Sequence, residues 1–168
     1  MFKQEIRLAI YEPDIPQNLG AMIRLCACFG IDIDLIEPCG FPFSLKALKR
    51  TAMDYIDLAK IDCHDDFDSF LKKYQYNRRL ILLTVKSPET IWDFKFKSND
   101  ILIVGSESKG VPNYVRESVP FNVRIPILSH TRCLNVTTAA SIGVSEAVRQ
   151  NNKSVSYTHL TLPTKRIV

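Results

Sequence analysis

An arginine among small residues is the first feature of this sequence that suggests chemistry. If the residues between Asn18 and Gly30 form a helix, the positions three and four residues before and after Arg24 adjoin it on the helix surface. All four of those neighbours are small: Gly20, Ala21, Ala27 and Cys28. Another backbone or a ligand therefore has room to approach Arg24. A solvated arginine beside an ordinary packing surface would give the same spacing, so the pattern alone leaves both interpretations open.

A loop with a glycine at each end follows the apolar run of residues 101–104, and it reads Gly105-Ser106-Glu107-Ser108-Lys109-Gly110. Glycines at the carboxyl end of a strand let the backbone approach a ligand, and open α/β sheets bind their ligands at that edge. The loop lacks the G-x-G-x-x-G pattern of dinucleotide-binding proteins. A simple glycine turn is the alternative interpretation.

A third segment combines a short apolar run with a helix of small residues. Residues 124–127 read Arg-Ile-Pro-Ile, and after a loop residues 134–141 read Leu-Asn-Val-Thr-Thr-Ala-Ala-Ser. Asn135 is suited to cap a helix whose next turns pack their backbone closely against another segment. Ordinary capping and helix packing would produce the same sequence.

The elements that must position these segments alternate along the chain. Strands are predicted at residues 6–13, 31–38, 79–85, 100–105 and 122–127, with a brief one near 56–60. Helices are predicted between Asn18 and Gly30 and at residues 45–52, 64–74 and 134–150. The nearly continuous apolar runs at 79–85 and 100–105 suit central strands covered on both faces. The alternation predicts an α/β protein with a mainly parallel sheet flanked by helices.

The first helix has a predicted beginning and end. Asn18 is the expected N-cap and Gly30 the residue that stops the helix. An apolar stripe should face the core, and it consists of Leu19, Ile23, Cys26 and Ala27. The strand after this helix alternates apolar and acidic residues at residues 31–34, a period-2 pattern.

Composition bounds the class of protein. The chain has 168 residues, of which 46% are hydrophobic and 24% charged, and this fits one domain with a real core. Its first residues are charged, and no run reaches the roughly 18 apolar residues of a membrane span, so we expect neither secretion nor insertion. Five cysteines without paired spacing favour a reducing cytoplasm. The histidines, His64, His130 and His159, match no zinc spacing, so we expect no metal site.

The end of the sequence differs from the rest. Residues 154–168 show no periodicity and resemble read-through into vector sequence, so the expected domain is residues 1–153 and the last segment a non-native or disordered tail. That tail contains Lys165 and Arg166 and no acidic residue, so without it the net charge is +2, two below the +4 of the whole chain. Mild basicity permits RNA binding without arguing for it.

Taken in order, the motifs resemble the SPOUT superfamily of knotted methyltransferases. Within it the chain is most similar to the bacterial tRNA (cytidine/uridine-2′-O)-methyltransferases of the wobble nucleotide. The similarity spans residues 6–150 and rests on four stretches: YEPDIPQNLGAMIRLCA, IEPCGF, GSESKGVP and RIPI followed by LNVTTAA.

The resemblance implies a parallel sheet whose C-terminal part forms a deep trefoil knot, a rare exception to the usual rules of chain topology. It implies that S-adenosylmethionine binds in the knotted loops and leaves as S-adenosylhomocysteine. The cofactor-binding positions carried over are Leu83, Gly105, Glu107, Gly110, Ile125, Cys133, Leu134 and Asn135. Cys133 stands where relatives commonly carry serine.

The resemblance also implies a reaction. A ribose 2′-hydroxyl attacks the methyl group in line, without a metal. Arg24 matches the catalytic arginine, and because a guanidinium normally stays protonated, we expect it to hold the ribose phosphate and stabilise developing negative charge. Asn18 would position the turn that presents Arg24. Ser145 stands where some relatives have tyrosine, and we expect it to be a small helix residue without chemical duty.

The partners implied are a second copy of the chain and the tRNA anticodon stem-loop. The enzymes of this superfamily work as homodimers, in which the arginine of one subunit faces the cofactor of the other. Candidate phosphate contacts are Lys46, Lys49, Arg50, Lys86, Lys109 and Arg132. For each of them, a solvating surface charge is the more common explanation.

Three alternatives remain from the sequence. The first is a related SPOUT methyltransferase that acts on ribosomal RNA or on another tRNA position. The second is a noncatalytic RNA-binding module on the same fold, against which the presence of Arg24 and the glycine loop argues. The third is a flavodoxin-like binding protein, which the missing phosphate loop after the first strand disfavours.

Overall fold

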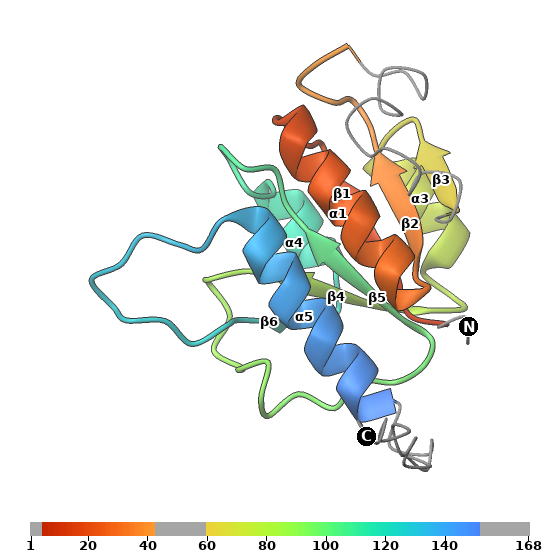
Figure 1. Cartoon of the computed structure of the whole chain (residues 1–168). Helices are drawn as coiled ribbons and strands as arrows, with labels where there is room; N and C mark the ends of the chain where they lie inside the picture. The colour runs from red at the N-terminus through yellow and green to blue at the C-terminus, as the bar shows by residue number, and fades with distance from the viewer. Residues whose placement is uncertain (1–4, 43–59, 152–168) are drawn as a thin grey trace, which may run out of the picture.

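A parallel sheet forms the centre of the molecule (Figure 1). The computed structural model describes residues 5–42 and 60–151, and within them the sheet has six strands in the order β3-β2-β1-β5-β4-β6. Every neighbouring pair of these strands is parallel. The strands are β1 (Arg7–Tyr11), β2 (Asp32–Ile36), β3 (Ile61–His64), β4 (Arg79–Leu83), β5 (Asp100–Val104) and β6 (Phe121–Val123). The predicted α/β class is confirmed.

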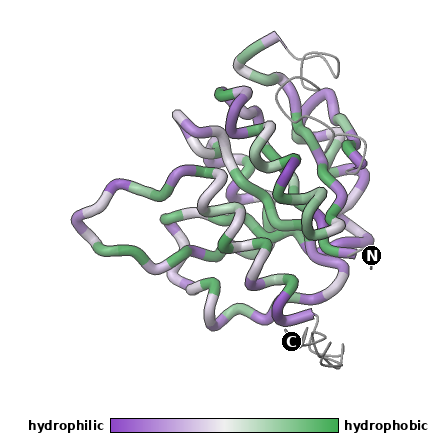
Figure 2. Tube along the Cα trace, in the orientation of Figure 1, coloured by the Kyte–Doolittle hydropathy of each residue, from purple (hydrophilic) through white to green (hydrophobic). Residues whose placement is uncertain are grey.

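Helices cover both faces of this sheet. The helices are α1 (Pro16–Phe29), α3 (Phe67–Tyr74), α4 (Asn113–Ser118) and α5 (Val136–Asn151). α1 and α5 lie side by side on one face, and α3 and α4 lie on the other (Figure 1). The strands between these layers are the green apolar segments at the centre of Figure 2. All five residues of β1 and of β5 are buried, as the continuous apolar run at 100–105 predicts for the latter.

Local signals explain where most helices begin and end. α1 ends at Gly30 with φ 67, the left-handed conformation that glycine adopts freely, as predicted. α5 is capped by Asn135, whose Oδ1 accepts a hydrogen bond from the Thr137 N–H at 2.8 Å, also as predicted. The prediction that Asn18 caps α1 is wrong. The helix starts at Pro16, whose fixed φ suits a first turn, and Asn18 lies inside that turn.

The region between β2 and β4 differs from the prediction. β3 spans Ile61–His64, later than the strand predicted near 56–60, and His64 belongs to it rather than to a helix. α3 begins at Phe67 because the carboxylate of Asp66 accepts the Ser69 N–H at 2.7 Å. The helix predicted at 45–52 and most of the 56–60 strand fall outside the described residues. α4 was not predicted.

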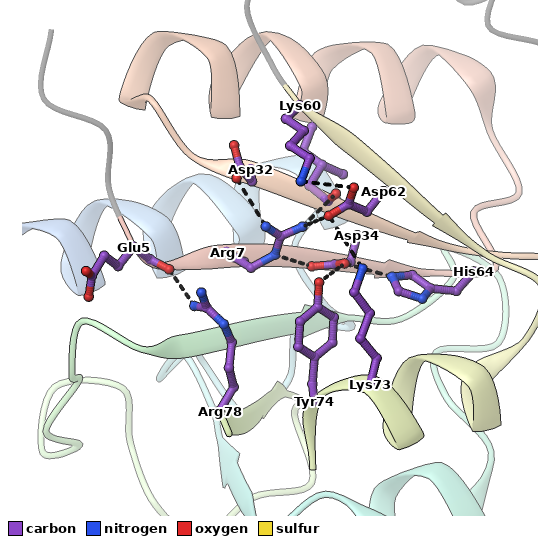
Figure 3. Close-up of polar contacts among 11 residues, drawn as sticks. Glu5, Arg7, Asp32, Asp34, Lys60, Asp62, His64, Lys73, Tyr74 and Arg78 are labelled. Carbon is purple, nitrogen blue, oxygen red and sulfur yellow. Dashed lines mark hydrogen bonds and ion pairs between the residues drawn. The ribbon is translucent and has the colours of Figure 1, made fainter. Parts of the chain in front are cut away.

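The strand predicted from the alternation at residues 31–34 is confirmed as β2, but its acidic residue Asp34 is fully buried. Its Oδ2 accepts a hydrogen bond from Nε of Arg7 at 2.6 Å, and its Oδ1 lies 2.7 Å from Nε2 of His64 and 2.9 Å from the hydroxyl of Tyr74. Arg7 also pairs with Asp32 at 3.1 Å and with Asp62 at 2.7 Å (Figure 3). We call this group of six residues the Arg7 cluster. It lies in the β1–β2–β3 half of the sheet, with Tyr74 contributed by α3.

Candidate functional site

A cavity of about 600 Å³ opens at the carboxyl ends of β4 and β5. Most of its lining comes from the segments that follow β4, β5 and β6 and from the first turns of α1 and α5. The chain leaves β1 toward β2 on one side and leaves β5 toward β6 on the other, so the connections of these neighbouring strands diverge. Open α/β sheets bind ligands at the carboxyl edge near such a point.

The cavity gathers nine of the ten predicted site residues. Asn18 lines it together with all eight predicted cofactor-binding residues: Leu83, Gly105, Glu107, Gly110, Ile125, Cys133, Leu134 and Asn135. These residues come from four segments that are far apart in the sequence. The tenth, Arg24, does not line the cavity and is exposed on α1.

The loop after β5 forms one wall and is folded tightly back on itself. Ser106 and Gly110 exchange two backbone hydrogen bonds, at 3.1 and 2.9 Å, and Gly110 has φ +68. A Cβ atom on Gly105 would lie 2.6 Å from the carbonyl carbon of Gly110, closer than real Cβ contacts. Both glycines are therefore required by the backbone geometry of this wall.

Glu107 joins this wall to the start of α1. Its Oε2 accepts a hydrogen bond from the Asp14 N–H at 2.7 Å, and its Oε1 accepts one from Nδ2 of Asn18 at 3.0 Å. The carboxylate of Asp14 in turn accepts hydrogen bonds from the N–H and the hydroxyl of Ser108. The hydroxyl and N–H of Ser108 hold the pKa of Asp14 below its usual range.

The opposite wall belongs to the segment that connects β6 to α5. This segment projects from the body of the molecule at the left of Figure 1 and returns at Asn135. Ile125 packs against the core, whereas Cys133 is exposed. Asn135 reaches across to α1, where its Nδ2 lies 3.4 Å from Oδ1 of Asn18.

Cationic side chains surround the cavity. Lys86 and Lys109, two of the predicted phosphate contacts, line it, and Arg132 is exposed on the projecting segment. The other three, Lys46, Lys49 and Arg50, lie outside the described residues. Arg116 of α4 also lines the cavity and was missed, because nothing in its neighbouring sequence distinguishes it from a surface arginine.

Ser145 lies away from the cavity, on the exposed side of α5. It borders a shallow hollow between α1 and α5 together with Leu25, Phe29, Trp92, Ser141, Ile142 and Glu146. Trp92 is 52% exposed there.

Within residues 5–42 and 60–151, no group of His, Cys, Asp and Glu side chains is arranged to hold a metal ion. None of the helices in the described part of the chain is long and apolar enough to cross a membrane.

A parallel sheet with a cavity at its carboxyl edge defines an open α/β protein that binds a small ligand. Comparison with known proteins identifies its family. The SpoU rRNA Methylase family matches residues 5–145, and the chain belongs to that family. This confirms the resemblance found in the sequence.

Individual relatives agree with the family assignment. The tRNA (cytidine(34)-2′-O)-methyltransferase of Beijerinckia indica subsp. indica is 45% identical over 85% of this chain and 90% of its own length. A structure described as giving insights into the 2-OH methylation of C/U34 on tRNA superposes with a TM-score of 0.81 at 33% identity, covering 86% of this chain and 95% of the other. An AdoMet-bound rRNA methyltransferase from Sinorhizobium meliloti has a TM-score of 0.79 at 23% identity, covering 92% of this chain and 59% of the other, and therefore shares the fold.

Proposed function

We propose that this chain transfers a methyl group from S-adenosylmethionine to the ribose 2′-hydroxyl of the wobble nucleotide of tRNA, a cytidine or a modified uridine. The observation that carries the proposal is the convergence of nine motif residues on one cavity at the carboxyl edge of the sheet. The relative that is 45% identical over 90% of its length bears the name of this activity.

The cavity fits S-adenosylmethionine. Its volume of about 600 Å³ lies within the range of small-molecule sites, roughly 300–1,000 Å³. Leu83, Ile125 and Leu134 supply apolar surface for an adenine ring, and the loop from Gly105 to Gly110 brings backbone close to the ligand. When bound, S-adenosylmethionine supplies a methyl group on a positively charged sulfur.

The chain's own residues contribute position and charge. Arg24 holds the phosphate of the target nucleotide and stabilises the negative charge that develops on the 2′-oxygen. Its guanidinium keeps its charge, so the hydroxyl proton passes to another acceptor or to water. Asn18 fixes the first turn of α1 through its hydrogen bond to Glu107, and Arg24 lies further along the same helix.

A second copy of the chain completes the active site in this proposal. Arg24 lies outside the cavity of its own chain, so the cavity of one subunit receives the arginine of another. The surface suited to pairing is the α1–α5 hollow, where Leu25, Phe29 and Ile142 are partly exposed beside Trp92. Apolar area of this kind is enriched in the cores of homodimer interfaces.

Ser145→Arg tests this surface. A charged, bulky side chain on the exposed side of α5 should prevent close pairing, so sedimentation should shift from dimer toward monomer. Glu117→Arg, on the opposite face in α4, is the matched control and should leave the dimer intact. A dimer that persists at micromolar concentration in Ser145→Arg would place the interface elsewhere.

The knot is part of the same proposal, in which the final segment threads the loop of residues 84–99. Two sets of contacts support it. After β6, Arg124 exchanges backbone hydrogen bonds with Glu89 and Ile91 of that loop, at 2.9 and 2.8 Å. Near the end of α5, Gln150 bonds the Phe94 carbonyl and the Phe96 N–H, both at 3.0 Å. The loop thus holds both ends of the segment that would pass through it.

The RNA partner we propose is the tRNA anticodon stem-loop. Lys86, Lys109 and Arg116 at the cavity and Arg132 beside it would contact its phosphates, and such binding weakens steeply with salt. We propose a cytoplasmic location, which a tRNA substrate and the five free cysteines support.

Methyl transfer from labelled S-adenosylmethionine tests the function directly. Unmodified transcripts and tRNA isolated from cells are incubated separately with the enzyme, and the modified nucleoside is located by mass spectrometry. We expect a 2′-O-methyl group at nucleotide 34. Transfer only to ribosomal RNA or to another tRNA position, or cofactor binding without transfer, would overturn the proposal.

A further inference from the structure

Two loops beside the cavity hold each other through a reciprocal pair of carboxylates. Glu107, in the loop after β5, accepts the backbone N–H of Asp14, in the loop after β1, at 2.7 Å. Asp14 accepts the backbone N–H of Ser108 at 3.1 Å and the Ser108 hydroxyl as well. We call these contacts the Asp14 clasp. It joins residues 93 and 94 positions apart in the sequence.

The clasp continues into α1. The second oxygen of Glu107 accepts Nδ2 of Asn18 at 3.0 Å, so one carboxylate spans the β1–α1 turn and the first turn of the helix. Both its oxygens accept hydrogen bonds from protein donors. Glu107, which the family resemblance implies as a cofactor-binding residue, is therefore also suited to hold Asn18.

A third loop packs on the clasp. The N–H of Gly40, after β2, donates to the Pro13 carbonyl at 2.9 Å. A Cβ atom on Gly40 would lie 3.0 Å from Oδ1 of Asp14 and 3.1 Å from its Cα. Asp14 thus sits where the loops after β1, β2 and β5 meet, and its side chain has little room to move.

We propose that Asp14 is a positioning residue for methyl transfer. Through Ser108 it fixes the cavity loop, and through its own N–H it orients Glu107, which holds Asn18 and hence the helix that carries Arg24. The clasp sets the position of Arg24 relative to the cavity, and in the dimer it does so for both active sites. This inference rests on the proposed function. Misplacement of reacting groups by about 1 Å is enough to lower a rate on the order of 100-fold.

The chain offers a closely matched control. Asp66, the N-cap of α3, accepts the N–H and the hydroxyl of Ser69, both at 2.7 Å, and so makes the same two kinds of hydrogen bond far from the cavity. Asp66→Ala therefore measures the effect of losing an exposed Asp–Ser pair that lies far from the cavity. Asp14→Ala should lower the rate of methyl transfer, whereas Asp66→Ala should affect only stability.

The test compares Asp14→Ala, Asp14→Asn, Ser108→Ala, Asp66→Ala and the unaltered chain. With saturating tRNA and S-adenosylmethionine, we expect Asp14→Ala to lower the single-turnover rate about 10- to 100-fold, with a cofactor Kd within about threefold of the unaltered chain. Asp14→Asn, which keeps an oxygen acceptor, should recover most of the rate. Adding Asp14→Ala to Ser108→Ala should cost less than the two separate effects combined. Asp66→Ala should keep the full rate.

Three results would overturn the inference: equal rates in Asp14→Ala and Asp66→Ala, a weakened cofactor Kd with an unchanged rate, or full additivity of the Asp14 and Ser108 substitutions.

Hydrogen–deuterium exchange provides a readout that does not depend on activity. Asp14→Ala should speed exchange in residues 106–110 and in the first turn of α1, whereas Asp66→Ala should not, and unchanged exchange would also refute the clasp. Absence of tRNA methylation by the unaltered chain would instead refute the proposed function, while the exchange measurement still decides on the clasp.

Discussion

Arg24→Ala is expected to lower kcat for tRNA methylation by about 100-fold or more while leaving the affinity for S-adenosylmethionine nearly unchanged. Removing one group that stabilises developing negative charge typically costs 10²–10³ in rate. In the proposal, Arg24 contacts the phosphate and the 2′-oxygen of the RNA rather than the cofactor, so its loss should leave cofactor binding nearly unchanged. The measurements are steady-state methyl transfer and calorimetric binding of S-adenosylmethionine.

Two control variants refine this result. Arg24→Lys keeps the charge without the planar fork of donors, so we expect partial recovery. Arg78→Ala removes a partly exposed arginine that donates to the Glu5 carbonyl at the opposite end of the sheet, and it should keep the full rate. A full rate in Arg24→Ala would remove that residue from the mechanism.

Mixing inactive subunits tests whether Arg24 acts across the dimer. Gly105→Ala should disable the cavity, because its Cβ would collide with the backbone of Gly110 at 2.6 Å. A heterodimer of Arg24→Ala and Gly105→Ala subunits then has one site with an intact cavity and an intact arginine from the partner. Activity should reappear on mixing. If each site used its own arginine, neither site of the heterodimer would be intact and mixing would restore nothing.

Arg7→Met is expected to lower the free energy of unfolding by about 3–5 kcal/mol, the usual cost of removing one partner of a buried ion pair. The Arg7 side chain is 8% exposed and pairs with three carboxylates, one of them on the fully buried Asp34. Without the arginine, Asp32, Asp34 and Asp62 would converge without their central cation. Urea unfolding followed by circular dichroism measures the change.

Lys60→Met is the control, at a residue that pairs with Asp62 of the cluster but is not one of its six members. Its side chain is 61% exposed and its nitrogen lies 3.4 Å from Asp62, so we expect a loss below about 1 kcal/mol. The double variant Arg7→Met with Asp34→Leu should be more stable than Arg7→Met alone, because it no longer buries an unpaired charge. Equal losses of unfolding free energy in Arg7→Met and Lys60→Met would show that the buried ion pairs of Arg7 stabilise the fold no more than the exposed pair of Lys60.

The same cluster gives stability a defined dependence on pH. Burial raises the pKa of Asp62, but the charges of Arg7, Lys73 and Lys60 outweigh it and the net pKa lies below its ordinary 3.8. The resulting stabilisation is present above pH 3.8 and is lost as the pH falls further. Burial raises the pKa of Tyr74 above its ordinary 10.0, so its contribution is present below pH 10.0 and is lost as the pH rises. Tyr74→Phe should reduce the alkaline loss of stability and leave the acid side unchanged.

Features set by neighbouring residues could be predicted from the sequence. Gly30 ends α1 because glycine adopts the left-handed conformation freely, and Leu19, Ile23, Cys26 and Ala27 face the core because of helical spacing. β5 was recognisable because a strand covered on both faces consists of apolar residues throughout. The cavity residues came from the family resemblance, carried over motif by motif.

Features set by distant residues could not be predicted in the same way. The burial of Asp34 depends on Arg7, His64 and Tyr74, which lie on other elements and bond its carboxylate. α4 has six residues and buries one hydrophobic side chain, Val115, so it leaves no periodic pattern. Arg116 reaches the cavity only through the position of that helix. Asn18 lies within α1 because Pro16 starts the helix earlier than the side-chain cap rule suggests.

The Arg7 cluster also decides which pairing the edge strand adopts. β3 pairs with β2 so that Asp62 stands opposite Asp34 and His64 opposite Ile36. Backbone hydrogen bonding alone would tolerate a slip of one residue, but that slip turns every side chain of the strand to the other face. Asp62 and His64 would turn away from Arg7 and Asp34, and Ile61 and Cys63 would take their places. The contacts of Asp62 and His64 with Arg7 and Asp34 therefore favour the observed alignment of the edge strand over a slipped one.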